Sequence, residues 1–325
     1  MALRAKIYSI RLAPPRRRVK NATMANESTT RIWTIGDLLT WTTDFFNKKK
    51  IDEGRLSAEL LLAHTLGCTR MALYTQYERV PAESQLAAFR AAVKQRAEHV
   101  PVAYLIGKAS FFSLDFSVNR QVLIPRPDTE TLVEQTIQRI RQAPGWETPA
   151  ILDLGTGSGC VAIALAKNLP TALVVATDQS AEALAIARQN AQALGVAERV
   201  SFGQGDLFGG LQTVTPPPPQ FHVIVSNPPY IATDQIATLQ EEVRDHEPRA
   251  ALDGGSDGLT MIRRILGETA DHLRPGGLLG IEIAYDQGPA VEALFSGAGY
   301  LENVRIVRDA AGNQRCVIAN KVQSV

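Results

Sequence analysis

The chain has 325 residues, enough for two domains, and its 45% hydrophobic and 21% charged residues are typical of globular proteins. No apolar run is long enough to span a bilayer, so we expect no membrane partner. Seven of the 34 Lys and Arg residues precede the first acidic residue, Glu27, which leaves 27 against 33 Asp and Glu in the rest of the chain. This mildly acidic body argues against direct nucleic acid binding.

Residues 1–30 form a basic extension that contains Pro14-Pro15 and lacks the continuous apolar segment of a signal peptide. Three interpretations are open: a disordered tail, an extension upstream of a start at Met24, and an organelle-targeting peptide. We favour the first two, which predict a cytoplasmic protein, and organellar targeting stays the alternative.

The cysteine and histidine patterns argue against a metal site. Cys68, Cys160 and Cys316 are far apart, odd in number and in no CxxC pair, so we interpret them as reduced thiols. The five histidines show no HExxH spacing. We therefore predict no metal ion.

The first half of the chain, from about Ile32 to Gly107, has a helical pattern. Leu56, Leu60 and Ala63 recur at the spacing of one helix face, and Gly67 is a plausible C-cap for that helix. We interpret this half as a small helical bundle.

A linker with strand character follows the helical half. Residues 110–118 partly alternate between apolar and polar, as a strand or hairpin would, and we expect Phe111 and Phe112 to lie in its core. Two prolines then precede Asp128 and Thr129, either of which is expected to cap a helix from Glu130 to about Arg141.

Strands and helices alternate in the second half, which predicts βαβ units and a parallel sheet covered on both faces. The expected strands are Ala150–Leu154, Leu173–Thr177, Val200–Phe202, His222–Ser226 and Leu278–Ile283, and the expected helices are Cys160–Asn168, Ala181–Leu194, Leu259–Leu273 and one near Pro289–Phe295. Ala311-Gly312-Asn313 then predicts a hairpin between two further strands, Asn303–Arg308 and Gln314–Asn320. Appended to the parallel strands, this hairpin would make a mixed sheet.

A glycine-rich turn follows the first of these strands and predicts a cofactor site. Its residues are Gly155, Thr156, Gly157, Ser158 and Gly159. Glycines let a ligand approach the backbone closely, and the spacing matches the dinucleotide fingerprint poorly. Asp178, at the end of the next strand, is placed to accept hydrogen bonds from ribose hydroxyls. The pattern fits a nucleoside without a pyrophosphate, such as S-adenosyl-L-methionine.

Asp206 and Leu207 follow the third strand, where a polar group and an apolar wall could hold adenine. An equally weighted interpretation makes Asp206 a simple turn or cap residue.

The fourth strand ends at Asn227-Pro228-Pro229-Tyr230. Two prolines cannot continue a strand ladder, so a stiff turn must follow. The Asn227 side-chain carbonyl and the Pro228 backbone carbonyl could accept both N–H bonds of a planar NH2 group, and Tyr230 could pack against it. The tetrapeptide alone does not distinguish this grip from an ordinary loop.

Several segments together resemble the HemK family of protein glutamine methyltransferases, most closely its peptide chain release factor branch. They are Pro125–Glu130, Asp153–Gly159, Asn227–Tyr230, Val243–Arg249, Ala251–Gly255, Asp257–Leu259, Gly276–Glu282 and Tyr285–Gly288. The similarity covers about Thr34 to Ala319, and the basic extension and the four prolines at 216–219 depart from it.

The resemblance implies an α/β fold: a Rossmann-like methyltransferase domain with a mixed seven-stranded sheet, its last strand antiparallel, preceded by a small helical bundle and a hairpin linker. The expected boundaries are an extension at 1–30, a helical substrate-docking domain at 31–108, a hairpin linker at 109–128 and the methyltransferase domain at 129–325. The implied reaction is methylation of the side-chain amide nitrogen of Gln in the Gly-Gly-Gln motif of class 1 release factors, with S-adenosyl-L-methionine as cofactor.

By motif match, Gly155 to Gly159, Asp178, Leu207 and Asn227 would contact the cofactor. Asn227, Pro228, Pro229 and Tyr230 would hold the substrate glutamine, with Asn227, Pro228 and Tyr230 as the catalytic residues. Three polar residues, Glu247, Arg249 and Asp253, are candidates for the pocket rim, although ion pairs within the loop are the favoured interpretation of each.

Three alternatives stay open. The family's ribosomal-protein branch performs the same chemistry on a different glutamine, but the Pro-Asp-Thr-Glu segment after Arg126 resembles the release factor branch. An adenine-N6 nucleic acid methyltransferase would share Asn-Pro-Pro-Tyr but would need a basic face, which the acidic body disfavours. A non-catalytic scaffold would bind cofactor without turnover, and the intact Asn227 site argues against it.

Overall fold

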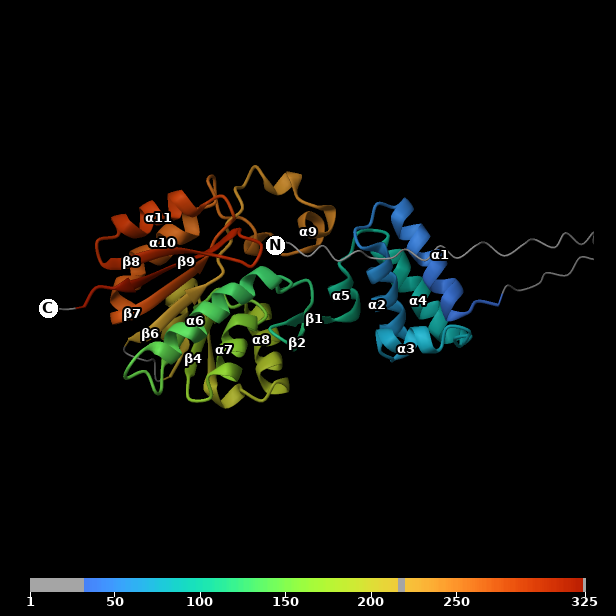
Figure 1. The fold of residues 1–325 in the computed structure, drawn as a ribbon, viewed down its shortest axis with the longest axis horizontal. Coiled ribbons are helices and arrows are strands. Elements are labelled where there is room, and N and C mark those ends of the chain that lie inside the picture. Colours follow the sequence, from blue (N-terminus) through green and yellow to red (C-terminus); the bar gives the residue numbers. More distant parts are fainter. Residues whose placement is uncertain (1–31, 216–219, 324–325) are drawn as a thin grey trace, which may run out of the picture.

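The computed structural model describes residues 32–215 and 220–323, and these form two lobes side by side (Figure 1). The basic extension at 1–30 and the four prolines at 216–219 lie outside the described residues. Within the described ranges, no helix is both long and apolar enough to cross a membrane. The domain boundaries expected above stay predictions.

The smaller lobe is helical. Its helices are α1 (Ile35–Lys48), α2 (Gly54–Leu66), α3 (Arg70–Thr75), α4 (Glu83–Arg96) and α5 (Val102–Ile106). α1 begins with a capping box, in which the Asp37 backbone N–H donates to the Thr34 hydroxyl and the Thr34 N–H donates to the Asp37 carboxylate. α2 ends at Gly67 in the left-handed conformation, as predicted.

The buried face of α2 differs from the one that the sequence spacing suggested. Leu61, Leu62 and Ala63 lie in the core of the helical lobe, whereas Leu56 and Leu60 are only half-buried. Both leucines instead line a cavity between the two lobes. The spacing therefore identified the helix correctly, but its two leucines mark the side that faces the cavity and not the side that faces the core.

A two-stranded hairpin links the lobes. Its strands are β1 (Lys108–Phe111) and β2 (Leu114–Ser117), and the turn residues Phe112 and Ser113 both have positive φ, as a tight two-residue turn requires. Phe111 is fully buried and Phe112 packs partly buried against the same core, as expected. The Asn190 side chain bonds both backbone groups of Ser117 and so ties the hairpin to the larger lobe.

Thr129 occupies the N-cap position of α6 (Glu130–Gln142), as one of the two predicted alternatives, but the capping hydrogen bond expected from its side chain is absent. A short 3-10 turn, Pro127–Thr129, precedes this helix. The Thr129 hydroxyl instead accepts a hydrogen bond from Asn227, and Asp128 pairs with Arg315. Both side chains therefore interact with residues distant in sequence and not with the backbone N–H groups at the start of α6.

The larger lobe contains a seven-stranded mixed sheet, which confirms the predicted fold. Its strands are β3 (Ala150–Leu154), β4 (Leu173–Asp178), β5 (Val200–Gln204), β6 (Phe221–Ser226), β7 (Leu273–Glu282), β8 (Leu301–Arg308) and β9 (Gln314–Lys321). They lie in the order β5-β4-β3-β6-β7-β9-β8, with β3 to β7 parallel and β9 antiparallel to both neighbours.

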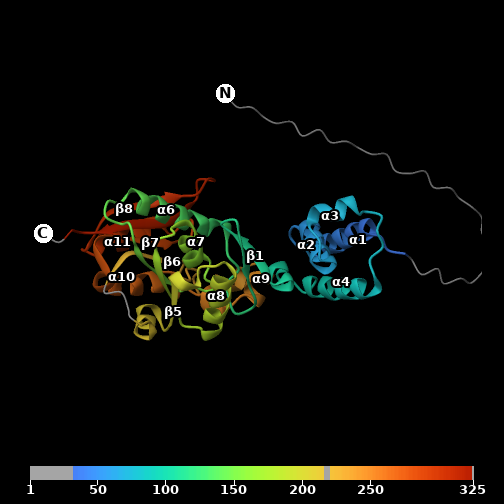
Figure 2. The same ribbon diagram turned by 90° about the horizontal axis from the view of Figure 1, so that it is seen from below.

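Helices cover both faces of this sheet (Figure 2). One apolar core forms beneath α6, α7 (Cys160–Asn168) and α8 (Ala181–Ala193), and a second forms beneath α10 (Thr260–His272) and α11 (Gly288–Gly297). Each helix lies within two residues of its expected bounds at either end. Burial on both faces explains why β3 and β6 are apolar along nearly their whole length.

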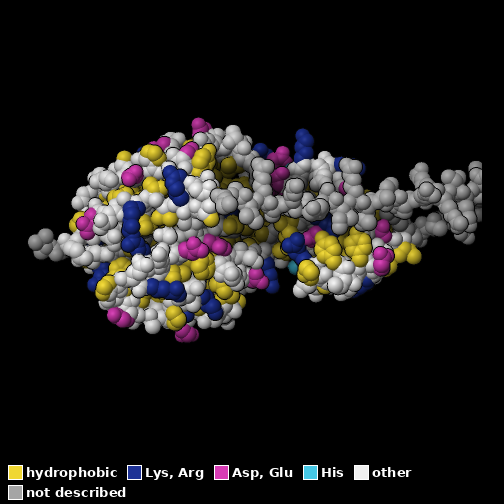
Figure 3. Space-filling view, viewed as in Figure 1, with side chains coloured by type: hydrophobic (Ala, Val, Ile, Leu, Met, Phe, Trp, Pro, Cys, Tyr) yellow, Lys and Arg dark blue, Asp and Glu magenta, His cyan; other side chains and the backbone are white. Residues whose placement is uncertain are grey.

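The lobes also touch through α9 (Glu241–His246), a short helix of the larger lobe. Glu242 pairs with the buried Arg96 at 2.7 Å, Glu241 with His99 at 2.8 Å, and the His246 ring lies 3.0 Å from the Glu98 carbonyl. The surface is hollowed where the lobes meet, below the linker in Figure 3. The contact is therefore polar and leaves an opening beside it.

The buried carboxylate of Glu59 is expected to stabilise the helical lobe. It accepts hydrogen bonds from Arg55 at 2.7 Å, from Arg70 at 2.6 Å and from the Tyr74 hydroxyl. Burial would raise the pKa of Glu59, but these bonds outweigh it and lower the pKa to about 2. We predict that Glu59→Gln lowers the free energy of unfolding by about 1–3 kcal/mol at pH 7.

Urea unfolding curves across a pH series test this prediction. Because the folded pKa lies below the unfolded one, the stabilisation is present above about pH 4.5 and is lost as the pH falls toward 2. Glu83→Gln is the control, since that side chain is 79% exposed and its ion pair is long. Equal unfolding of the two variants at pH 7 would contradict the role given to Glu59.

Candidate active site

The glycine-rich turn joins β3 to α7 and has an unusual backbone. Gly155, Gly157 and Gly159 all have positive φ, which side-chain-bearing residues rarely adopt. A Cβ added at Gly155 or Gly157 would meet nothing within 4 Å, so the turn faces open space. At Gly159 a Cβ would lie 3.1 Å from the Ala187 Cβ, so this glycine allows α7 to approach α8.

Asp153, which sequence reasoning did not assign a role, supports the turn from beneath. It is fully buried and accepts hydrogen bonds from the Thr156 hydroxyl at 2.6 Å and the Ala162 N–H at 3.2 Å. Burial raises the pKa of Asp153 to about 6, against the effect of these bonds. A carboxylate inside an otherwise apolar strand was the signal that could have identified it.

Asp178 lies at the end of β4 beside the turn. One carboxylate oxygen accepts from the Gly157 N–H at 2.8 Å and the other from the Ser180 N–H at 2.9 Å. Burial raises the pKa of Asp178, and the backbone hydrogen bonds oppose that rise. The carboxylate is thus oriented along one wall of a crevice.

That crevice, of about 250 Å³, brings together most of the predicted cofactor residues. Gly155, Gly157, Asp178, Asp206, Leu207 and Asn227 line it, together with Pro228 and Pro229. Thr156, Ser158 and Gly159 do not line it; the first two are buried within the turn. The cofactor contacts predicted for these three residues stay predictions, and none of the three lines the crevice.

Asp206 and Leu207 occupy different settings in the crevice. The Asp206 side chain pairs with Arg264 at 2.7 Å and is 56% exposed, whereas Leu207 is buried with a φ of 48°. Left-handed backbone is uncommon for leucine and here presents a buried side chain as an apolar wall. Residues that the sequence did not predict for this site also line the crevice, among them Gln121 to Leu123 of the linker and Met261.

The Asn-Pro-Pro-Tyr turn sits between this crevice and a second, smaller pocket. Asn227 lines both cavities, while Tyr230 lines only the smaller one, of about 90 Å³. The Asn227 NH2 group donates to the Thr129 hydroxyl at 3.1 Å, and the Tyr230 hydroxyl donates to Glu282 at 3.3 Å. Burial raises the pKa of Tyr230, so its hydroxyl keeps its proton.

A third cavity, of about 410 Å³, lies between the lobes and shares Arg126 and Val243 with the small pocket. Arg126 donates to the buried Glu247 carboxylate at 2.6 Å, and burial raises the pKa of Glu247 against this pairing. Arg249 pairs with Asp253 at 3.3 Å within the loop, as the favoured interpretation had it, whereas the partner of Glu247 lies 121 residues away and outside the loop.

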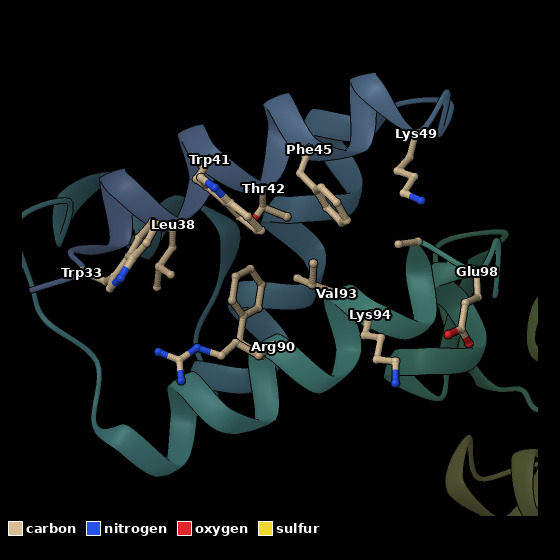
Figure 4. A pocket seen from close by; sticks show the side chains of 12 residues that line it. Trp33, Leu38, Trp41, Thr42, Phe45, Lys49, Arg90, Val93, Lys94 and Glu98 are labelled. Carbon is tan, nitrogen blue, oxygen red and sulfur yellow. The ribbon is translucent and has the colours of Figure 1, made fainter. Parts of the chain in front are cut away.

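Another cavity, of about 570 Å³, lies between α1 and α4 of the helical lobe (Figure 4). Trp41 and Phe45 stack along α1 with ring centroids 5.2 Å apart, and Val93 of α4 points toward α1. Arg90 and Lys94 also line the groove, but their side chains point away from α1. No residue predicted to bind cofactor or glutamine lines this groove. Among residues 32–215 and 220–323, no group of three His, Cys, Asp or Glu side chains is arranged to hold a metal ion.

The crevice could hold a nucleoside methyl donor, and the small pocket could hold a planar amide. The open backbone at Gly155 and Gly157 leaves room for the donor, and the Asp178 carboxylate lies on the wall where a ribose would be held. Asn227 stands at the junction, so an amide in the small pocket would face the donor.

Comparisons with known proteins agree with this geometry. Residues 37–107 match the PrmC N-terminal domain, and residues 129–255 match the methyltransferase small domain. The release factor glutamine methyltransferase of Rhodopirellula baltica is 42% identical over 299 residues, which cover 92% of this chain and 100% of the relative. The Geobacter sulfurreducens enzyme of the same name is 44% identical over 83% of this chain and 91% of its own.

A solved structure shows a similar fold. The hMettl16 catalytic domain in complex with MAT2A 3′UTR hairpin 6 aligns with a TM-score of 0.50 and 15% identity, over 72% of this chain and 82% of that one. The chain belongs to the HemK family, among the release factor glutamine methyltransferases.

Proposed function

We propose that this protein transfers a methyl group from S-adenosyl-L-methionine to the side-chain amide nitrogen of the glutamine in the Gly-Gly-Gln motif of class 1 release factors. The observation that carries the proposal is the position of Asn227, which lines both the cofactor crevice and the small pocket. The names of the relatives support the choice of release factors as substrate. Such a reaction belongs in the cytoplasm, where we place the protein.

The cofactor supplies an electrophilic methyl group on a sulfonium. We propose that the Asp178 carboxylate accepts hydrogen bonds from the ribose hydroxyls of the cofactor. The cofactor would approach the protein backbone closely at Gly155 and Gly157, which have no side chain in the way. Leu207 and Asp206 form the wall for the adenine. Thr156, Ser158 and Gly159 act through the shape of the turn, because they are absent from the crevice lining.

An amide nitrogen is a poor nucleophile, since its lone pair is delocalised into the carbonyl group. In the proposed mechanism the glutamine amide reaches from the small pocket to the edge of the crevice. There the Asn227 side-chain carbonyl, which borders both cavities, and the Pro228 backbone carbonyl, which borders the crevice, accept its two N–H bonds. These acceptors aim the nitrogen at the methyl group and favour the positive charge that develops on it. Tyr230 packs against the amide plane, and the proton leaves after methyl transfer.

The size and position of the pockets support glutamine next to glycine. The small pocket, of about 90 Å³, suits one side chain, and it shares Arg126 and Val243 with the cavity between the lobes. A substrate loop entering from that cavity must bring its backbone close to the rim, which glycines allow. Docking of the rest of the release factor on the helical lobe completes the proposal.

A labelling assay tests the substrate. Purified protein and labelled S-adenosyl-L-methionine are incubated with a release factor, its Gly-Gly-Ala variant, ribosomes and DNA. We expect label on the intact release factor alone. Equal label on the Gly-Gly-Ala variant would refute the glutamine, label on ribosomes would favour the ribosomal-protein branch, and label on DNA would favour the adenine-N6 alternative.

The role of Asn227 predicts a large loss of turnover. We expect Asn227→Ala to lower kcat on the release factor by about 100-fold, the usual cost of removing one transition-state hydrogen bond. Steady-state kinetics and a melting curve measure turnover and folding separately. Asn313→Ala, in the turn between β8 and β9, is the control and retains full turnover. An active Asn227→Ala enzyme would refute this role.

The role of Asp178 predicts a loss of cofactor affinity. Asp178→Asn replaces a charged acceptor by a neutral one, and we expect the Kd of S-adenosyl-L-methionine to rise about 10- to 100-fold. Isothermal titration calorimetry measures it directly. The matched control is Asp271→Asn, an exposed carboxylate on α10. Equal affinities for the two variants would remove Asp178 from the cofactor site.

A further inference from the structure

A chain of polar side chains lies buried behind the Asn-Pro-Pro-Tyr turn. Thr129, from the turn before α6, is 1% exposed, and Glu282, at the end of β7, is 2% exposed. The Asn227 NH2 group donates to the Thr129 hydroxyl at 3.1 Å, and the Tyr230 hydroxyl donates to Glu282 at 3.3 Å. Thr129 also interacts with the Glu282 carboxylate, which links all four residues.

The direction of the hydrogen bonds along this chain follows from the chemistry of its members. An ionised carboxylate only accepts, so Tyr230 and Thr129 must each turn their single hydroxyl proton toward Glu282. The Thr129 oxygen then has only lone pairs left for Asn227. The carboxamide of Asn227 can therefore face Thr129 only with its NH2 group.

We propose that Thr129 and Glu282 are positioning residues that hold the Asn227 carboxamide in one of its two flipped orientations, with the carbonyl oxygen toward the substrate. The inference rests on the proposed function, because it explains how Asn227 presents an acceptor to the glutamine amide. The flipped orientation would set the Asn227 NH2 group against the glutamine NH2 group. Two facing donors cannot hydrogen-bond, so the glutamine amide nitrogen would no longer be oriented toward the methyl group.

The surroundings of Glu282 make this arrangement sensitive to protonation. The ionisable groups facing it are Tyr230, Asp128 of the 3-10 turn, Arg315 and Cys316 of β9, and Cys160 of α7. Burial raises the pKa of Glu282 to about 7, against the hydrogen bonds from Thr129 and Tyr230. Its second carboxylate oxygen, Oε2, has no hydrogen-bond partner among the described residues. Protonated Glu282 would itself donate and release Thr129 to turn toward Asn227.

Three threonine variants test the hydroxyl. Thr129→Val removes it at nearly constant shape, and we expect kcat on the release factor to fall about 10- to 100-fold while the Kd of S-adenosyl-L-methionine changes less than about twofold. Thr129→Ser keeps a hydroxyl and restores most of the turnover. Thr136→Val is the matched control, since this buried threonine of α6 bonds the Leu132 carbonyl of its own helix, and it retains wild-type kcat.

Glu282→Gln tests the carboxylate. In the wild type, kcat rises with pH through about 7, because the ionised form accepts from Thr129. The Glu282→Gln variant is expected to have a lower kcat that lacks this rise. The same rise in Glu282→Gln, or equal kcat for Thr129→Val and Thr136→Val, would overturn the inference. Loss of release factor methylation by the wild type would instead refute the proposed function, so the two failures are distinguishable.

Discussion

The parallel pairing of three adjacent strands is the constraint on which the site depends. Leu154 of β3 lies beside Thr177 of β4 on one side and beside Ser226 of β6 on the other. All three strands therefore end at one edge, and the residues that follow them emerge together. The Gly155 N–H bonds the Thr177 carbonyl, and the Ser226 hydroxyl bonds the Leu154 carbonyl, so the three strand ends are tied to one another. A shift of one residue in either pairing would separate the glycine-rich turn after β3 from the Asn-Pro-Pro-Tyr turn after β6.

The helical lobe contributes to the site because the small pocket shares lining residues with the cavity between the two lobes. The hairpin is anchored by buried Phe111 and Phe116, and α9 reaches back to the helical lobe through Glu242 and Arg96. These contacts set the cavity between the lobes next to the Arg126–Glu247 pair. An ion pair with one buried carboxylate keeps its geometry better than an exposed pair does. The route to the small pocket is thus shaped by both lobes and not by the sheet alone.

Most of the fold and part of the site follow from local sequence. Most strand and helix bounds in the larger lobe were predictable because apolar runs, glycines and prolines act over a few residues. The exceptions are β7, which begins at Leu273 and not at the expected Leu278, and α9, which was not predicted. The hydrogen-bond partners of Thr129 and Glu282 were not predictable, because they lie far away in the chain. Threonine is a residue type favoured at helix caps, yet the Thr129 hydroxyl accepts a hydrogen bond from Asn227, which lies 98 residues further along the chain. The positive φ of Leu207 has no signal in the residue itself, since it depends on packing around the crevice.

The missing capping hydrogen bond at Thr129 carries information about function. A threonine just before a helix would normally satisfy an N–H of the first turn and so stabilise the protein. Here that hydroxyl serves Asn227 instead, beside a carboxylate whose burial raises its pKa and leaves one oxygen without a partner among the described residues. Both features destabilise the fold locally. Departures of this kind are expected where a side chain must be held in one orientation for chemistry. Their coincidence at Asn227 argues that the amide acceptor is the part of the site that needs orienting most.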